Sequence, residues 1–285
     1  MIRQYYYLTK PGIVYGNAIT AAAGFFLASG TNINFGALAA MTGGIGLVMA
    51  SACVLNNVID RDIDQHMERT RKRSLVTGKI STRNAIIYAA ILGISGALLL
   101  NFFTNFLTLC IALVGVIAYI GWYTPLKRRS VFSTLVGSIS GAVPPVVGYV
   151  AVTNRLDAGA LILFLILVCW QMPHFYAISI FRREEYAAAG LPILSVKHGV
   201  AAAKKQIIVF MIGFLVAVTL LKFFGFGGYT YLAVMVLGAL GWLIVGARGF
   251  QKDIDDKLWA RQVFKYSLWL LITLYVALLS NLILP

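Results

Sequence analysis

Residues 158–170 read AGALILFLILVCW and contain no charged side chain. The run is apolar at every position, whereas a strand of a membrane β-barrel would alternate apolar and polar residues. A bilayer core about 30 Å thick takes roughly 20 apolar residues as a helix, and unpaired backbone groups are too costly in lipid for open sheets. The run therefore predicts part of a transmembrane helix.

The whole chain has the composition of a membrane protein. Of its 285 residues 60% are hydrophobic and only 12% are charged, which a water-soluble domain of this length could not carry on its surface. Apolar runs between charged or Gly/Pro-marked breaks predict nine spans, at residues 13–29, 36–57, 84–103, 106–123, 133–153, 158–181, 205–224, 228–247 and 264–284. The expected fold class is all-α, a polytopic membrane protein, and residues 1–285 are expected to form a single intramembrane domain.

The fifth predicted span contains two consecutive prolines, Pro144 and Pro145. Proline has no backbone N–H and clashes with the preceding turn, so it leaves carbonyl groups inside a helix without their usual partners. In a bilayer such groups must line a cavity or pack on a neighbour. We therefore expect a cavity or a close helix contact at this point.

The formal net charge of +14 is distributed unevenly between the loops. All 24 lysine and arginine residues except Arg155 and Lys222 lie in or beside the amino-terminal segment and loops 2–3, 4–5, 6–7 and 8–9. By the positive-inside rule this places the amino terminus in the cytoplasm and the carboxy terminus outside. Every acidic residue except Asp157 shares that side, which sidedness alone does not explain. The charges indicate a bound cation and an anionic substrate instead of a nucleic acid.

Asn56, Asp60 and Asp64 follow the second predicted span at intervals of four residues. If the helix continues, they lie above one another on one face, and Asp62 points away. Two carboxylates and an amide suit Mg²⁺, which takes few protein ligands when substrate phosphates complete its shell. A solvated loop that caps the span is the alternative. Two like charges one turn apart on an apolar helix would be unfavourable without a cation, so the pattern favours a metal site.

A basic stretch, ERTRKRSLVTGK at residues 68–79, comes directly after these acids. Guanidinium groups bind phosphate oxygens in pairs and neutralise them, so basic residues beside a metal site indicate a metal diphosphate. In loop 4–5, Tyr123 and Lys127 lie four residues apart, and a base there could hold the diphosphate from a second side. Membrane-sidedness signals, lipid headgroup contacts and interfacial anchoring are the alternatives for both stretches.

His174 lies about two turns inside the end of the sixth predicted span, beside a proline. An ionisable residue within a span is a functional candidate, and a hydrogen-bonded core histidine is the alternative.

Past the end of this span, Glu184 and Glu185 could supply carboxylates to a second cation, opposite the first set. Arg182 and Lys197 are the bases beside them.

These motifs resemble those of the UbiA-type intramembrane prenyltransferases over nearly the whole chain. The NxxxDxxxD motif of that superfamily matches Asn56, Asp60 and Asp64, and its YxxxK motif matches Tyr123 and Lys127. The nine-helix arrangement of the superfamily also matches the nine predicted spans.

Within the superfamily the chain is most similar to the heme O synthases. The stretches that carry this similarity are TKPGIVYGN, NNVIDRDID, ERTRKRSLVTG, YTPLKR, GSISGAVPPVVGY and QMPHFYAISIFRREEY. Most relatives that act on quinone precursors have paired aspartates in the second motif, whereas this subgroup has PHFYA and a single acid before a tyrosine. Two departures from the subgroup are Ser74 in place of proline and Glu185 in place of aspartate.

The resemblance implies that farnesyl diphosphate and heme B are the substrates, heme O and diphosphate the products, and Mg²⁺ the cofactor. It implies that Asn56, Asp60, Asp64 and Glu185 bind metal and that His174 contacts the heme, with Asp60, Asp64, Lys127 and His174 catalytic. The diphosphate-binding residues that it implies are Arg69, Arg73, Tyr123, Lys127, Arg182 and Lys197.

The resemblance further implies a cell (inner) membrane protein with its active site near the cytoplasmic face. Its product would pass to a downstream heme-modifying enzyme or to heme-copper oxidase assembly. A transferase acting on a quinone or chlorophyll precursor remains an alternative, and a membrane transporter is an alternative of another class. Against a transporter, the charged groups cluster at one membrane face instead of crossing it.

Overall fold

The computed structural model describes residues 2–65, 68 and 70–280. In this part of the chain every regular element is helical, and nine helices are long and apolar enough to cross a membrane. They are α2 (Pro11–Ser29), α3 (Phe35–Ile59), α5 (Thr82–Phe103), α6 (Phe106–Ile117, continued to Leu126), α8 (Ser133–Thr153), α9 (Ala158–Phe181), α12 (Gly199–Phe223), α13 (Tyr229–Ala247, continued to Phe250) and α14 (Asp256–Ser280). The predicted fold class and the predicted number of spans are confirmed.

Two of these helices begin well before the predicted residue, whereas the others begin within two residues of it. α12 begins at Gly199 instead of 205, because Lys204 is accommodated inside the helix by an ion pair with Asp256 and a hydrogen bond to the carbonyl of Gly249 at 2.5 Å. α14 begins at Asp256 instead of 264, because the Asp255 carboxylate caps its first backbone N–H groups. Counting apolar residues alone misses helical turns that side chains of this kind stabilise.

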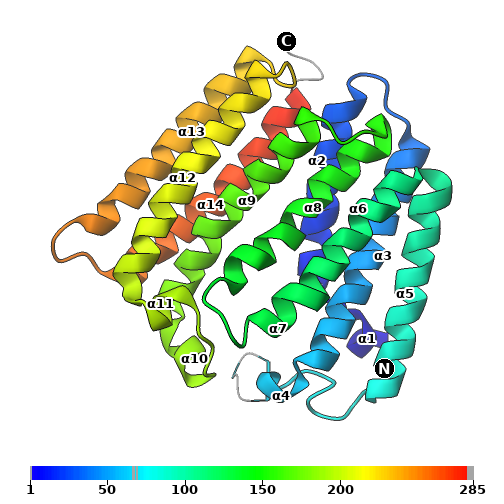
Figure 1. Cartoon of the computed structure of the whole chain (residues 1–285), viewed down its shortest axis with the longest axis horizontal. Coiled ribbons are helices and arrows are strands. Elements are labelled where there is room, and N and C mark those ends of the chain that lie inside the picture. The colour runs from blue at the N-terminus through cyan, green and yellow to red at the C-terminus, as the bar shows by residue number, and fades with distance from the viewer. Residues whose placement is uncertain (1, 66–67, 69, 281–285) are drawn as a thin grey trace.

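The short helices gather at one end of the bundle. α1 (Ile2–Leu8), α4 (Arg61–Asp64), α7 (Thr124–Leu126), α10 (Arg183–Ala188) and α11 (Leu194–Lys197) all lie there, whereas α14 runs to the opposite end (Figure 1). α8 and α9 pack against each other in the middle of the bundle and are among the most buried spans. α2, α3 and α6 lie on the α8 side, and α12, α13 and α14 lie on the α9 side. The connections that carry the charged motifs are therefore neighbours in space.

The double proline lies at a very close contact between α2 and α8. A Cβ atom on Gly24 would lie 2.0 Å from the carbonyl oxygen of Pro145, and one on Gly148 would lie 1.8 Å from that of Ala21. Pro144 and Pro145 are both buried inside α8. Of the two sequence-based alternatives, close packing on a neighbouring helix is therefore the one observed. Glycine is required at these positions because any side chain would separate the two backbones.

We expect Gly24→Ala to destabilise the protein by about 1–3 kcal/mol, because the added methyl group collides with the backbone of α8. Gly16→Ala is the matched control in the same helix, since nothing lies within 4 Å of its added Cβ, and alanine favours the helix. Thermal unfolding of both variants in detergent, followed by size-exclusion chromatography, measures the difference. Equal unfolding temperatures would show that the two helices are not in contact at Gly24.

Candidate active site

The carboxylate cluster, defined here as the side chains of Asn56, Asp60 and Asp64, lies where α3 ends. Although α3 ends at Ile59, the backbone N–H of Asp60 donates to the carbonyl of Asn56, and that of Asp64 to the carbonyl of Asp60, both at 2.9 Å. The helical register therefore continues across the break into α4. All three side chains are buried, whereas that of Asp62 is 61% exposed. The predicted shared face is confirmed, although the helix itself is interrupted at Asp60.

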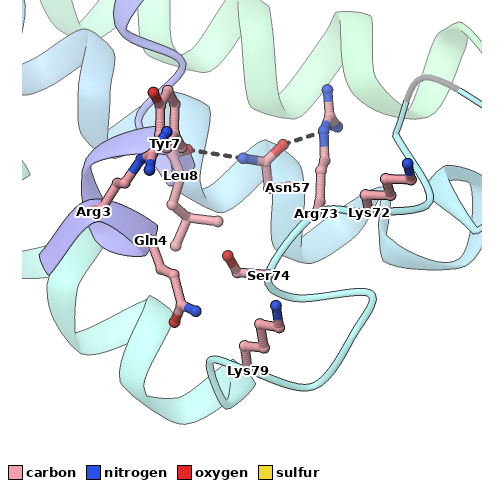
Figure 2. Close-up of a pocket in the computed structure, with 9 residues that line it drawn as sticks. All are labelled: Arg3, Gln4, Tyr7, Leu8, Asn57, Lys72, Arg73, Ser74 and Lys79. Carbon is pink, nitrogen blue, oxygen red and sulfur yellow. Dashed lines mark hydrogen bonds between the residues drawn. The ribbon is translucent and has the colours of Figure 1, made fainter. Parts of the chain in front are cut away.

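Basic side chains from two other segments neutralise this cluster. Lys127, directly after α7, forms an ion pair with Asp60, and Arg73, in the segment after α4, forms one with Asp64. Arg73 also donates to Asn57 Oδ1 at 3.1 Å (Figure 2). A carboxylate removed from water is strongly unfavourable unless it is paired and hydrogen-bonded. The cations therefore stabilise the buried acids, and the structure brings these predicted site residues together.

Arg128 joins the same two segments at the exposed rim of the cluster. Its guanidinium donates to both carboxylate oxygens of Asp62, at 2.7 and 2.8 Å, and to the carbonyl of Ile59 at 2.8 Å. The hydrogen bond from Arg128 lowers the pKa of Asp62. Nη2 of Arg128 also lies 3.8 Å from Oδ1 of Asp60. Arg128 directly follows the YxxxK motif, but no sequence pattern distinguished it from its basic neighbours.

The amide of Asn56 has one orientation that satisfies its neighbours. Thr124 donates its hydroxyl proton to the carbonyl of Tyr119 at 2.7 Å, so its oxygen accepts from Asn56 Nδ2 at 3.0 Å. Oδ1 of Asn56 then accepts from the Lys10 ammonium at 2.6 Å. Tyr119 and Thr124 meet in this way because residues Ala118–Tyr123 form a π-helix, a local widening that is frequent at functional sites.

Lys10 is a partly buried member of this site that the sequence patterns did not indicate. It precedes Pro11 at the start of α2 and has the left-handed backbone conformation, with φ 55°, which costs a non-glycine residue about 1 kcal/mol or more. Burial lowers its pKa to about 8. The strained backbone directs the side chain to the carboxylate cluster, where it adds a fourth cation beside Lys127, Arg73 and Arg128. A lysine before the proline that opens an apolar run was the available signal in the sequence.

The donor atoms of the cluster fit a divalent cation. Oδ1 of Asp60 is buried and has no hydrogen-bond partner among the described residues, and such an atom is unfavourable unless a ligand occupies it. Within the described ranges, no three His, Cys, Asp or Glu side chains converge as a metal site. Two aspartates and an amide therefore offer few protein ligands, which suits Mg²⁺ with phosphate oxygens in the rest of its shell.

Tyr123 lies at the edge of this site. Its ring stacks on that of Tyr119, with the centroids 5.7 Å apart, and packs so closely on α8 that a Cβ on Gly137 would lie 2.7 Å from it. Its backbone carbonyl accepts from the N–H of Lys127 at 2.9 Å. Tyr123 thus connects the π-helix to the lysine that pairs with Asp60.

His174 lies on α9, whereas the carboxylate cluster lies on the α8 side of the bundle. Its ring is buried between the aromatic rings of Trp170 and Phe264, with centroid separations of 4.9 and 4.7 Å. Nδ1 lies 2.8 Å from Oγ of Ser267 on α14. His174 is therefore held by a neighbouring helix, as the core interpretation expected, and this contact also defines its tautomer.

The tautomer of His174 follows from the partners of Ser267. The Ser267 hydroxyl donates its only proton to the carbonyl of Phe264 at 2.6 Å, so toward His174 its oxygen accepts. Nδ1 must then carry the proton, and Nε2 keeps its lone pair. A histidine that donates through one ring nitrogen and has a lone pair on the other has the arrangement of a metal-ligating imidazole. The contact that looks purely structural is thus compatible with a heme ligand.

The described residues after α9 that were predicted to bind diphosphate or metal do not contact the carboxylate cluster. Glu185 forms an ion pair with Arg182 at 3.3 Å, and both are more than a third exposed. Glu184 and Lys197 are also exposed, on α10 and at the end of α11. These elements lie at the same end of the bundle as α4 (Figure 1). Arg69 lies outside the described residues.

Residues 17–272 match the UbiA prenyltransferase family, and the chain belongs to this family. It is therefore a prenyltransferase and an integral membrane protein, and the transporter alternative is excluded.

Several curated relatives match nearly the full chain. Protoheme IX farnesyltransferase 2 of Chromobacterium violaceum is 50% identical over 93% of this chain and 88% of its own length. Protoheme IX farnesyltransferase of Pectobacterium carotovorum is 48% identical over 94% of this chain and 91% of its own. The protein of the same name in Sodalis glossinidius is 46% identical over 100% of this chain and 96% of its own.

Solved structures share the fold at low sequence identity. A digeranylgeranylglyceryl phosphate synthase has a TM-score of 0.84 at 19% identity, covering 99% of this chain and 98% of that one. A UbiA homolog from Archaeoglobus fulgidus, bound to GPP and Mg²⁺, has a TM-score of 0.70 at 18% identity, covering 97% and 99%.

We expect Asp60→Asn and Asp64→Asn to lower kcat by roughly a thousandfold or more, because metal-assisted departure of a phosphate group is worth several kcal/mol. Asp62→Asn is the matched control and should cost less than about fivefold, since it breaks only an exposed ion pair. Prenyl transfer at saturating Mg²⁺ gives the three values. Equal losses at all three positions would contradict the assignment of one face to the metal.

Proposed function

We propose that this chain transfers the farnesyl group of farnesyl diphosphate to a vinyl group of heme B and adds water, giving heme O and diphosphate. The observation that carries the proposal is the 46–50% identity, over almost the whole chain, to proteins named protoheme IX farnesyltransferase. The fold by itself leaves the acceptor open, because structural neighbours at 18–19% identity include a synthase of another prenylated product.

The carboxylate cluster is the proposed site of diphosphate departure. Asn56, Asp60 and Asp64 would hold Mg²⁺, which supplies charge neutralisation to the departing diphosphate. Lys127 and Arg73 are paired with the two carboxylates, and they can turn to phosphate oxygens once a metal diphosphate enters. Arg69, Tyr123, Arg182 and Lys197 are proposed to bind the same group, and Glu185 to bind metal.

The chemistry on the prenyl chain follows from loss of the diphosphate. The bond between C1 and the diphosphate oxygen breaks, and the electron pair leaves with the diphosphate. The vinyl group of heme then attacks the allylic cation, and water adds to the resulting cation beside the porphyrin and releases a proton. Exclusion of bulk water by the surrounding apolar helices prevents quenching of the first cation. Neutralisation of the leaving group by preorganised charges is the main contribution of the protein.

His174 is proposed to orient the heme. Its Nε2 has the lone pair that heme iron requires, and Ser267 fixes the ring through Nδ1. Axial ligation would hold one vinyl group toward the farnesyl carbon. A quinone precursor contains no metal for such a ligand, so this residue distinguishes heme from a quinone acceptor.

Several further properties belong to the same proposal. The protein acts in the cell (inner) membrane, with the end that bears the carboxylate cluster toward the cytoplasm, as the distribution of basic residues favours. The chain acts as a single intramembrane domain. Heme O then passes to a downstream heme-modifying enzyme or to heme-copper oxidase assembly.

Incubation of the purified protein with Mg²⁺, heme B and farnesyl diphosphate tests the proposal directly. Mass spectrometry of the porphyrin is expected to show heme B plus one farnesyl group and one hydroxyl group, and release of diphosphate should be equimolar. EDTA should abolish both. A second reaction with a quinone precursor in place of heme B serves as the control. Prenylation of that acceptor alone would overturn the heme assignment while leaving the enzyme class intact.

We expect His174→Ala to shift the absorption bands of bound heme and to lower product formation, with farnesyl diphosphate binding nearly unchanged. Ser267→Ala should weaken heme binding about tenfold, because partners of a metal ligand typically contribute 10–100-fold. Thr273→Ala is the control on α14, since among the described residues that hydroxyl bonds only the carbonyl of Trp269 in its own helix. Absorption spectra and heme titrations measure these effects. An unaltered spectrum with normal turnover in His174→Ala would remove the ligand role.

A further inference from the structure

A cavity of about 580 Å³ lies between the amino-terminal helix and the segment that follows α4. Arg3 and Gln4 line it from α1, and Lys72, Ser74 and Lys79 line it from the other segment (Figure 2). Asn57, which neighbours the carboxylate cluster in sequence, lines its floor and donates to the carbonyl of Leu8 at 2.8 Å. The cavity is thus adjacent to the cluster but opens beside α1.

The cavity is strongly cationic. Arg3, Lys72, Arg73 and Lys79 line it, and none of its described lining residues is acidic. Within the described part of the chain, the ammonium groups of Lys72 and Lys79 have neither an ion-pair nor a hydrogen-bond partner, and both side chains are exposed. Arg73 is already paired with Asp64, whereas Arg3, Lys72 and Lys79 line the cavity without an acidic lining residue and repel one another. An anion bound among them would remove that repulsion.

The donors around the cavity match the oxygens of a phosphate group. Guanidinium and ammonium groups form charge-assisted hydrogen bonds to phosphate oxygens, and the Ser74 hydroxyl and the Gln4 amide add neutral donors. A carboxylate ligand would need fewer positive charges than this cavity provides. The number and type of donors therefore favour phosphate.

The position of α1 places the cavity at the edge of the membrane. Ile2 is 88% exposed, and the rings of Tyr6 and Tyr7 are also exposed on this short helix. Exposed tyrosines beside apolar side chains are typical of the membrane interface, where lipid phosphates lie. A phosphate on a lipid and a phosphate in free solution can both reach a cavity at this depth.

We propose that this cavity is a phosphate-binding site separate from the carboxylate cluster, and that it takes the phosphate of an anionic lipid or inorganic diphosphate. Arg73 connects the two sites, because it lines the cavity and pairs with Asp64. An anion in the cavity would compete with Asp64 for this guanidinium. Occupancy of the cavity would therefore influence how freely Asp64 binds a metal, whichever acceptor the enzyme prenylates.

The test compares two double variants that remove the same amount of charge. Arg3→Gln with Lys79→Gln alters the cavity, whereas Lys252→Gln with Lys257→Gln alters exposed lysines between η2 (Arg248–Phe250) and α14 and at the start of α14. Lipid-free protein in a sugar detergent with EDTA is titrated with inorganic diphosphate by calorimetry. Native mass spectrometry of the same samples counts bound phosphatidylglycerol, with phosphatidylcholine as the uncharged comparison. Neither measurement involves turnover, so the result is independent of the proposed reaction.

We expect the cavity variant to bind one or both anions about tenfold more weakly than the wild type, and the control variant to bind as the wild type does. Loss of diphosphate binding alone identifies a free anion as the ligand, and loss of phosphatidylglycerol alone identifies a lipid. Equal affinities in the two variants, or no binding of either anion by the wild type, would overturn the proposal. Matching unfolding temperatures of the two variants exclude misfolding as the cause of a difference.

Discussion

The placement of two carboxylates inside an apolar bundle is the constraint on which this site depends. Asp60 and Asp64 are almost completely buried, and a buried carboxylate is tolerated only when cations and hydrogen bonds replace its water. Those cations come from two other segments, through Lys127 and Arg73. The end of α3, the segment after α4 and the connection between α6 and α8 are thereby fixed relative to one another. The same pairs that allow the acids to be buried also assemble the charges that a diphosphate needs.

The cluster has more cationic partners than its two acids require, and this excess is informative. Lys10 and Arg128 approach the same group of side chains as Lys127 and Arg73, yet one oxygen of Asp60 still has no hydrogen-bond partner among the described residues. An arrangement that served stability alone would satisfy that oxygen. The proposed exchange of internal ion pairs for a metal diphosphate would account for both the surplus of positive charge and the unsatisfied atom.

The central helices connect the two halves of the proposed reaction. The carboxylate cluster lies on the α8 side, and His174 with Ser267 lies on the α9 side, and α8 packs directly on α9. Close backbone contact at Gly24 and Gly148 holds α2 against α8. Such rigid packing suits a reaction in which an allylic cation must meet a particular vinyl group, because small displacements of reacting atoms lower rates steeply.

The sequence by itself determined the fold class, the nine spans and the shared face of Asn56, Asp60 and Asp64, because these follow from local periodicity and from the length of helix that a bilayer requires. The sequence also shows a basic stretch next to each acidic motif along the chain. Only the tertiary structure decided which base meets which acid. It also revealed Lys10, Arg128 and Ser267, whose partners lie 46 or more residues away along the chain. It divided the predicted residues into a buried cluster and the exposed pair of Arg182 and Glu185. The reason is physical: helix periodicity acts over a few residues, whereas the pairing of buried charges depends on which distant segments the packed helices bring together.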